Sequence, residues 1–167
     1  LGILGSDDAV ELLAGCIVPK TIHNPLHDAA VEIVDSMLRP LVPIGWRIRI
    51  QSAITTSDSE PEPDLAIVRG DIRDHRTRHP GPHEVGLLIE VADSSVQRDR
   101  LKAELYARAG IANYWIVNLR ESQVEVYAKP IPSKAEYQHL ETISEGLVEV
   151  AINGQPIGKL SLKDLLP

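Results

Sequence analysis

The chain has little cysteine and no long apolar stretch, and these two absences exclude several classes of protein. Its single cysteine, Cys16, cannot form a disulfide within the chain or build a thiolate metal cluster. No apolar run approaches the roughly 20 residues of a membrane-spanning helix, and no basic and then apolar leader is present. The sequence starts at Leu1 rather than at a methionine, so we expect that natural residues could precede it. The default expectation is a cytoplasmic protein with no membrane partner.

The chain also has fewer basic than acidic residues. Lysine and arginine together number 17 against 24 acidic residues, which gives a formal charge of −7. Because phosphate binding needs a positive surface, any nucleic-acid site must be a local basic patch. A length of 167 residues with 43% hydrophobic residues is the usual size of one domain and can bury a core. We therefore expect a single domain over residues 1–167.

The spacing of apolar residues indicates a mixture of helices and strands. Steps of three and four residues predict a helix over about 27–41, and a second helix capped by Ser94 or Ser95 ends near Gly110. A tight hairpin is expected over 10–18, and Ser161 is expected to cap a short final helix. Strands are predicted at 46–50, 64–68, 86–92, 113–119, 123–127, 136–143 and 147–152. The predicted fold class is α/β.

Glu90 is the most informative single residue. It interrupts a nearly continuous apolar run, which is typical of a strand covered on both faces. A buried carboxylate costs several kcal/mol unless it is paired or bound to a metal. A structural reading, in which Arg47 or Arg49 pairs with Glu90, stays open beside the functional one.

Two further groups could join Glu90. Asp64 heads the preceding predicted strand, so if the two strands are neighbours their carboxylates could converge and bind a hard cation such as Mg²⁺. On the following helix Asp99, Lys102 and Tyr106 share one face, which could look back on the carboxylates. Lysine would there orient a water or stabilise a developing anion during phosphodiester hydrolysis. Lys102 could equally be an ordinary exposed helix lysine, and Asp64 could simply start a strand after a proline turn.

The most basic stretch is the predicted loop 69–84. Its arginines Arg73, Arg76 and Arg78 are candidate DNA contacts, although a solvated charged loop is the simpler reading, since acidic residues dilute its charge. The three histidines of the loop are four residues apart, but the prolines and glycine between them break any helix, which argues against a zinc site.

The ordered set of these segments resembles the large Uma-two type family of restriction-endonuclease-like proteins, within the superfamily named for its Pro-Asp…Asp/Glu-x-Lys motif. The resemblance covers roughly residues 10–127. It rests on VELLAG (10–15), His27, PEPDL (61–65), IEVADSS (89–95), DRLKAELYARAGI (99–111) and NYWIV (113–117). It implies a mixed central sheet flanked by helices, as in restriction endonucleases.

The resemblance also implies roles for single residues. Asp64 and Glu90 would bind metal, Glu11 would join them, and Lys102 would be the catalytic lysine. Ala92 stands where the simplest form of the motif has its lysine, so the lysine has moved onto the helix in this pattern. His27 would be either a helix-entry residue or a phosphate contact, and Asp99 and Tyr106 would support Lys102.

The leading expectation is an endonuclease that uses Mg²⁺ or Mn²⁺ to hydrolyse phosphodiester bonds of DNA. The alternative is a non-catalytic binding or assembly module that keeps the nuclease fold. A homodimer is expected to suit the cutting of both strands of a duplex, because two-fold symmetry is the commonest oligomer geometry.

Overall fold

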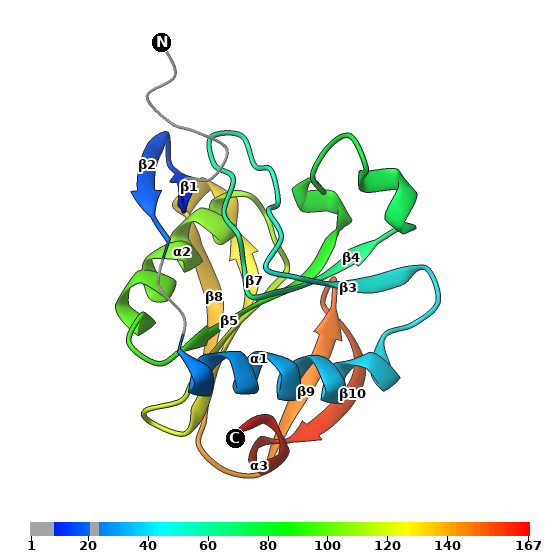
Figure 1. The fold of residues 1–167 in the computed structure, drawn as a ribbon, viewed down its shortest axis with the longest axis vertical. Coiled ribbons are helices and arrows are strands. Elements are labelled where there is room, and N and C mark those ends of the chain that lie inside the picture. Colours follow the sequence, from blue (N-terminus) through cyan, green and yellow to red (C-terminus); the bar gives the residue numbers. More distant parts are fainter. Residues whose placement is uncertain (1–8, 21–23) are drawn as a thin grey trace.

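A six-stranded mixed sheet forms the centre of the computed structural model, which describes residues 9–20 and 24–167 (Figure 1). In spatial order its strands are β3 (Trp46–Ile50), β4 (Leu65–Arg69), β5 (Val85–Ala92), β6 (Asn113–Asn118), β7 (Gln123–Ile131) and β8 (Glu136–Ile143). Only β5 and β6 run parallel; the other neighbours are antiparallel. A parallel pair needs a crossover connection, and the helix α2 (Val96–Arg108) supplies it.

The two faces of the sheet are covered by different elements. One face packs against the helix α1 (Pro25–Leu38), the short helix α3 (Leu162–Leu165) and the two-stranded ribbon of β9 (Leu147–Ile152) and β10 (Gln155–Ser161). The other face packs against α2. A hairpin of β1 (Val10–Leu13) and β2 (Cys16–Pro19) joins the sheet region through a bridge from Leu12 to Glu60. Short 3-10 helices lie at Arg39–Leu41, Ile72–His75, Pro82–Glu84 and Pro132–Lys134.

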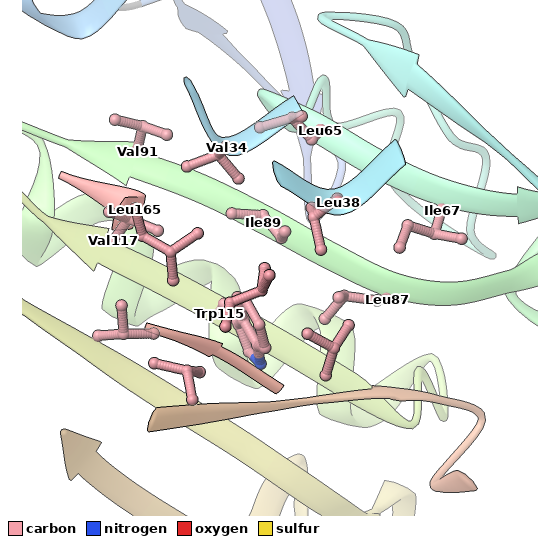
Figure 2. Close-up of a cluster of buried hydrophobic side chains, with 14 of the residues drawn as sticks. Val34, Leu38, Leu65, Ile67, Leu87, Ile89, Val91, Trp115, Val117 and Leu165 are labelled. Atoms are coloured by element: carbon pink, nitrogen blue, oxygen red, sulfur yellow. The ribbon is translucent and has the colours of Figure 1, made fainter. Parts of the chain in front are cut away.

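Alternation along β5 divides its side chains between these two faces. Figure 2 shows the face toward α1, where side chains of β5 meet those of α1, β4, β6 and α3. On β5 these are Leu87, Ile89 and Val91. Leu88 and Ala92 instead belong to the cluster around α2. Since side chains alternate with period two, Glu90 also points toward α2.

Most of the elements expected from the sequence are present, with small shifts of their ends. The first α-helix ends at Leu38, and a 3-10 turn that includes Pro40 continues the chain, because proline lacks the N–H of a regular helix. Neither Ser95 nor Ser161 makes the predicted side-chain cap bond, although helices do begin after both residues. The strand β10 was not predicted from the sequence. None of the helices within residues 9–20 and 24–167 is long and apolar enough to cross a membrane.

Candidate functional site

The pairing of β4 with β5 places Asp64 beside Glu90. Leu65 pairs with Ile89 in the antiparallel ladder, so the residue before β4 meets the end of β5. Asp64 Oδ2 accepts a hydrogen bond from the Val91 backbone N–H at 2.8 Å. Both carboxylates are buried, with 6% of Asp64 and 4% of Glu90 exposed. The condition set from the sequence, that the two strands be neighbours, is therefore met.

The helix α2 adds three polar side chains to this position. Lys102 Nζ and the Tyr106 hydroxyl both donate to Glu90 Oε1, each at 3.1 Å. Asp99 lies one turn earlier, 3% exposed, and accepts a hydrogen bond from Ser95 Oγ at 2.6 Å. Because Lys102 pairs with Glu90 and is itself buried, it is not an ordinary exposed helix lysine.

Two residues from the N-terminal segments complete the cluster. Glu11, on β1, places Oε2 3.3 Å from Lys102 Nζ and accepts the backbone N–H of Glu62, also at 3.3 Å. His27, in the first turn of α1, places Nε2 3.1 Å from Asp64 Oδ2. His27 is therefore a neighbour of the carboxylates within the site. We call the group Glu11, His27, Asp64, Glu90, Asp99, Lys102 and Tyr106 the carboxylate cluster.

Burial and mutual repulsion shift the protonation of these groups. Burial raises the pKa of Glu90 to about 8; Lys102 opposes this, while the charges of Asp64 and Asp99 add to it. Burial also raises the pKa of Asp99 to about 6. For Lys102, burial lowers the pKa, but Glu90, Glu11 and Asp99 outweigh it and hold the pKa above its usual value. The net effect on His27 is likewise a raised pKa, because Asp64 and Asp28 overcome the opposing effect of burial.

All members of the carboxylate cluster except Tyr106 line a cavity of about 70 Å³. One water needs roughly 10–15 Å³ on this measure, so the cavity has room for several small ligands. Its lining also includes Lys20, Asn24, Gln51, Glu62, Asp93, Ser94 and Ser95. Of these, Glu62 and residues 93–95 lie in segments that carry the family resemblance, but none of the seven was assigned to the site from the sequence. Asn24 could have been found as the cap before Pro25, since its side chain accepts the His27 N–H. Gln51 and Lys20 lie outside regular motifs, and only the tertiary fold brings them here.

The donor set suits a hard divalent cation. Among residues 9–20 and 24–167 no group of three or more histidine, cysteine or acidic side chains is already placed to hold a metal ion. Mg²⁺, however, is usually held by one or two carboxylates together with waters, and Asp64 and Glu90 supply two. Several buried carboxylates share one ammonium here, and the pKa of Glu90 is raised first by burial and then further by repulsion from Asp64 and Asp99. A bound cation would relieve that repulsion, so these residues fit such an ion.

The arginines of the loop 69–84 differ in their surroundings. Arg73 is 88% exposed at its side chain and lies 4.0 Å from Asp71, and Arg76 is also exposed. Arg78 instead donates through both terminal nitrogens to Glu84, at 2.6 and 2.7 Å. Glu84 also lies 3.3 Å from the buried His75.

The structural reading of Glu90 required a pair with an arginine of β3. Arg47 Nη2 instead lies 2.8 Å from His75 Nδ1, and Arg49 Nη2 donates to the Ala53 carbonyl at 3.3 Å. The cation that faces Glu90 is Lys102. That alternative is therefore wrong in its choice of partner.

Comparison with known proteins places the chain in a family. The model of the Uma2 family, described as "Putative restriction endonuclease", matches residues 3–158. A similar solved structure is the crystal structure of a "putative nuclease belonging to DUF820" from Anabaena variabilis, with a TM-score of 0.72 and 20% identity over 98% of this chain and 92% of that one. At this identity the likeness shows the fold alone. No curated protein matches. Because the family model covers nearly the whole sequence, the chain belongs to the Uma2 family.

Proposed function

We propose that the chain is an endonuclease that uses Mg²⁺ or Mn²⁺ to hydrolyse phosphodiester bonds of DNA. One observation carries the proposal: Glu90 is buried beside Asp64 and contacts Lys102 at 3.1 Å, on the wall of a cavity. Such hydrolysis needs two carboxylates that bind the cation and one ammonium group that stabilises the developing anion. Membership of a family described as "Putative restriction endonuclease" supports the endonuclease part of the proposal.

Each residue of the carboxylate cluster has a distinct part in this proposal. Asp64 and Glu90 hold the cation, with Glu11 next to them. A divalent cation supplies a lowered pKa for one water and offsets charge on the phosphodiester. Lys102, whose raised pKa keeps it protonated, stabilises the charge that develops on the phosphate oxygens.

The remaining members fix these groups in place. Tyr106 donates to the same oxygen of Glu90 as Lys102 does, which restrains the rotation of that carboxylate. His27 contacts Asp64 and stands at the cavity wall, where a positive imidazole could also meet a substrate phosphate. Asp99 lends negative charge that helps to keep Lys102 protonated.

DNA binding would rely on the loop 69–84. Arg73 and Arg76 are exposed and are the proposed phosphate contacts of the loop. Arg78 joins them in the proposal chiefly by fixing the loop, because both of its terminal nitrogens bond Glu84. On a chain of formal charge −7 this local basic stretch would orient the duplex.

A cleavage assay tests the proposal. Plasmid DNA incubated with Mg²⁺ or Mn²⁺ should be nicked or cut by the unmodified protein, and Asp64→Asn or Glu90→Gln should remove that activity. Glu125→Gln is the matched control, since Glu125 is an equally buried carboxylate of the same sheet, outside the cavity lining. Cleavage that survives Glu90→Gln, or that disappears in Glu125→Gln while the fold is retained, would refute the assignment. Cleavage confined to RNA would refute the choice of substrate.

A second candidate function is a binding or assembly module that keeps the fold without catalysis. The observation that favours it is the position of Lys102 between Glu90 and Glu11, which partly neutralises the cluster without any cation. The two functions differ in a Mn²⁺ titration followed by thermal unfolding. A nuclease site gives a saturable rise in the unfolding temperature that Glu90→Gln removes, whereas a pure scaffold is indifferent to the ion.

A further inference from the structure

The strand β8 (Glu136–Ile143) is an edge of the central sheet with a long exposed border. Among the described residues it pairs only with β7 within the sheet, and six of its eight residues are exposed. Edge strands present unpaired N–H and C=O groups, and natural proteins usually block them with charged side chains, lysine above all, with proline or with a bulge. The sequence of β8, EYQHLETI, has neither lysine nor proline, and its two acidic residues are Glu136 and Glu141. Its ladder with β7 is regular from Ile143 to His139.

We propose that β8 pairs antiparallel with β8 of a second copy of this chain, about a two-fold axis that passes through Leu140. This proposal is independent of the nuclease activity. Residues opposite each other in an antiparallel pair must both point their N–H and C=O groups toward the partner strand or both away from it. Since this direction alternates along a strand, a symmetric pair requires that the axis pass through a residue rather than between two residues.

The side chains then select one register. With the axis at Leu140, that residue faces its own copy, and His139 faces Glu141 of the second copy on both sides of the axis. With the axis at Glu141, two glutamates would face each other, and like charges directly opposite are destabilising. With the axis at His139, two histidines would face each other and neither would face a glutamate. An axis nearer either end of β8 would leave much of the strand unpaired. Charge complementarity therefore points to Leu140.

The surface around Leu140 supports the same register. Leu140 is 55% exposed and pairs with Tyr127 in the β7–β8 ladder. Together with Tyr127, Tyr137 and Ala103 of α2 it lines a shallow depression on the α2 side of the sheet. Arg100, Glu104 and Glu136 also line this depression. The second copy's Leu140 would pack beside Leu140 of the first, and both side chains would lose contact with water. On the opposite side of β8, His139 and Glu141 already lie 3.7 Å apart within one chain, so pairing would gather two histidines and two glutamates in alternation.

The result would be a continuous sheet that crosses two copies. An isologous two-fold contact of this kind closes on itself and does not propagate into fibres. A single strand pair is a modest interface, so the dimer should form in a concentration-dependent way.

Sedimentation velocity over a concentration series tests the proposal. The unmodified chain should move from monomer to dimer with rising concentration. His139→Glu places a carboxylate opposite Glu141 twice and should weaken dimerisation about tenfold. Glu141→Lys should also weaken it, because it places lysine opposite His139. Glu32→Lys makes the same charge change on an exposed position of α1 and should leave the dimer intact.

Mixing the two β8 variants tests the register itself. In a mixed pair the new carboxylate at position 139 faces the new lysine at position 141, and the remaining histidine faces the remaining glutamate. The mixture should therefore regain the dimer that each variant alone has lost. A chain that stays monomeric at every concentration overturns the proposal. So does a dimer that survives His139→Glu, or a mixture that stays monomeric.

Discussion

The helix α2 carries two cations, two residues apart in sequence, that pair with buried carboxylates of the sheet in different ways. Arg100 binds Glu125 of β7 through Nε and Nη2, and the Tyr127 hydroxyl donates to the same carboxylate. Lys102 contacts Glu90 of β5 and Glu11 of β1. Both sheet carboxylates are almost fully buried. Burial of a carboxylate alone therefore does not separate a structural pair from a candidate site.

The two ion pairs of α2 differ in their balance of positive and negative charge. One guanidinium meets one carboxylate in the pair Arg100–Glu125, with two-point geometry that satisfies both groups. In the carboxylate cluster one ammonium serves several carboxylates, and Glu90 has a pKa of about 8 as a result of burial and of its acidic neighbours. A surplus of buried acidic groups destabilises the metal-free protein. A bound cation would relieve this destabilisation, so the surplus favours cation binding.

The largest expected effect is on catalysis. Lys102→Met should lower the rate of DNA cleavage by about 10²–10³-fold, the range found when one group that stabilises a developing anion is removed. Arg100→Met, assayed below its unfolding temperature, should leave that rate unchanged. Mn²⁺ binding should persist in both variants, which shows that the cluster is still assembled. An equal loss of activity in the two variants would erase the distinction between the pairs.

A second effect concerns the free energy of unfolding. Arg100→Met leaves Glu125 buried with Tyr127 as its remaining donor, and should lower the stability by about 2 kcal/mol, since Arg100 itself is partly exposed. Chemical denaturation with urea measures this change. A loss under a few tenths of a kcal/mol would mean that the pair does not hold α2 to β7.

Neutralising each sheet carboxylate should change stability in opposite directions. Burial and the acidic neighbours raise the pKa of Glu90 to about 8, so at neutral pH the folded metal-free protein must hold this group largely protonated, whereas the unfolded chain ionises it. Glu90→Gln removes that penalty and should raise the stability by about 1 kcal/mol. Glu125→Gln removes the charge from a balanced pair and should lower it. The comparison must be made with a chelator present. Changes of the same sign in the two variants would contradict the assignment of one pair to function and the other to structure.

The smallest effect is expected at a third, more exposed pair. Arg78 lowers the pKa of Glu84 to about 2, with a backbone bond from Gly81 and the contact with His75 contributing further. The pair therefore contributes stability above the unfolded pKa near 4.5, and this contribution is lost as the pH falls toward 2. Glu84→Gln should reduce the acid-induced loss in that window. The check is the free energy of unfolding of the unmodified protein and of Glu84→Gln, measured as the pH falls from about 5 toward 2. If the two free energies fall by the same amount, the pair Arg78–Glu84 does not stabilise the loop.

The sequence predicts the fold better than it predicts the partners within it. Period-two alternation correctly places residues 90 and 92 on one face of β5, toward α2. Ala92 is fully buried there, as the apolar run of the predicted strand 86–92 indicated, and this leaves little room for the lysine that the simplest motif would have at that position. The strand β10 escaped prediction because Pro156 and Gly158 disfavour strands and a bulge separates them.

Within the site and around it, some residues could be predicted from the sequence and others could not. Asp64, Glu90 and Lys102 were identifiable because their positions relative to predicted elements, and their order along the chain, resemble a family pattern. The pair Arg100–Glu125 was not identifiable, because no motif links its members and only the packing of α2 on β7 brings them together. Lys20 and Gln51 reach the cavity through loops whose paths depend on tertiary contacts.

Calorimetric titration of the metal-free protein with Mn²⁺ tests the central claim most directly. We expect one saturable site in the unmodified protein, retained in Glu125→Gln and lost in both Glu90→Gln and Asp64→Asn. The first variant controls for the loss of a buried carboxylate as such. Absence of saturable binding in the unmodified protein, or unchanged affinity in Glu90→Gln, would contradict the claim that the surplus of buried charge around Glu90 is a cation site.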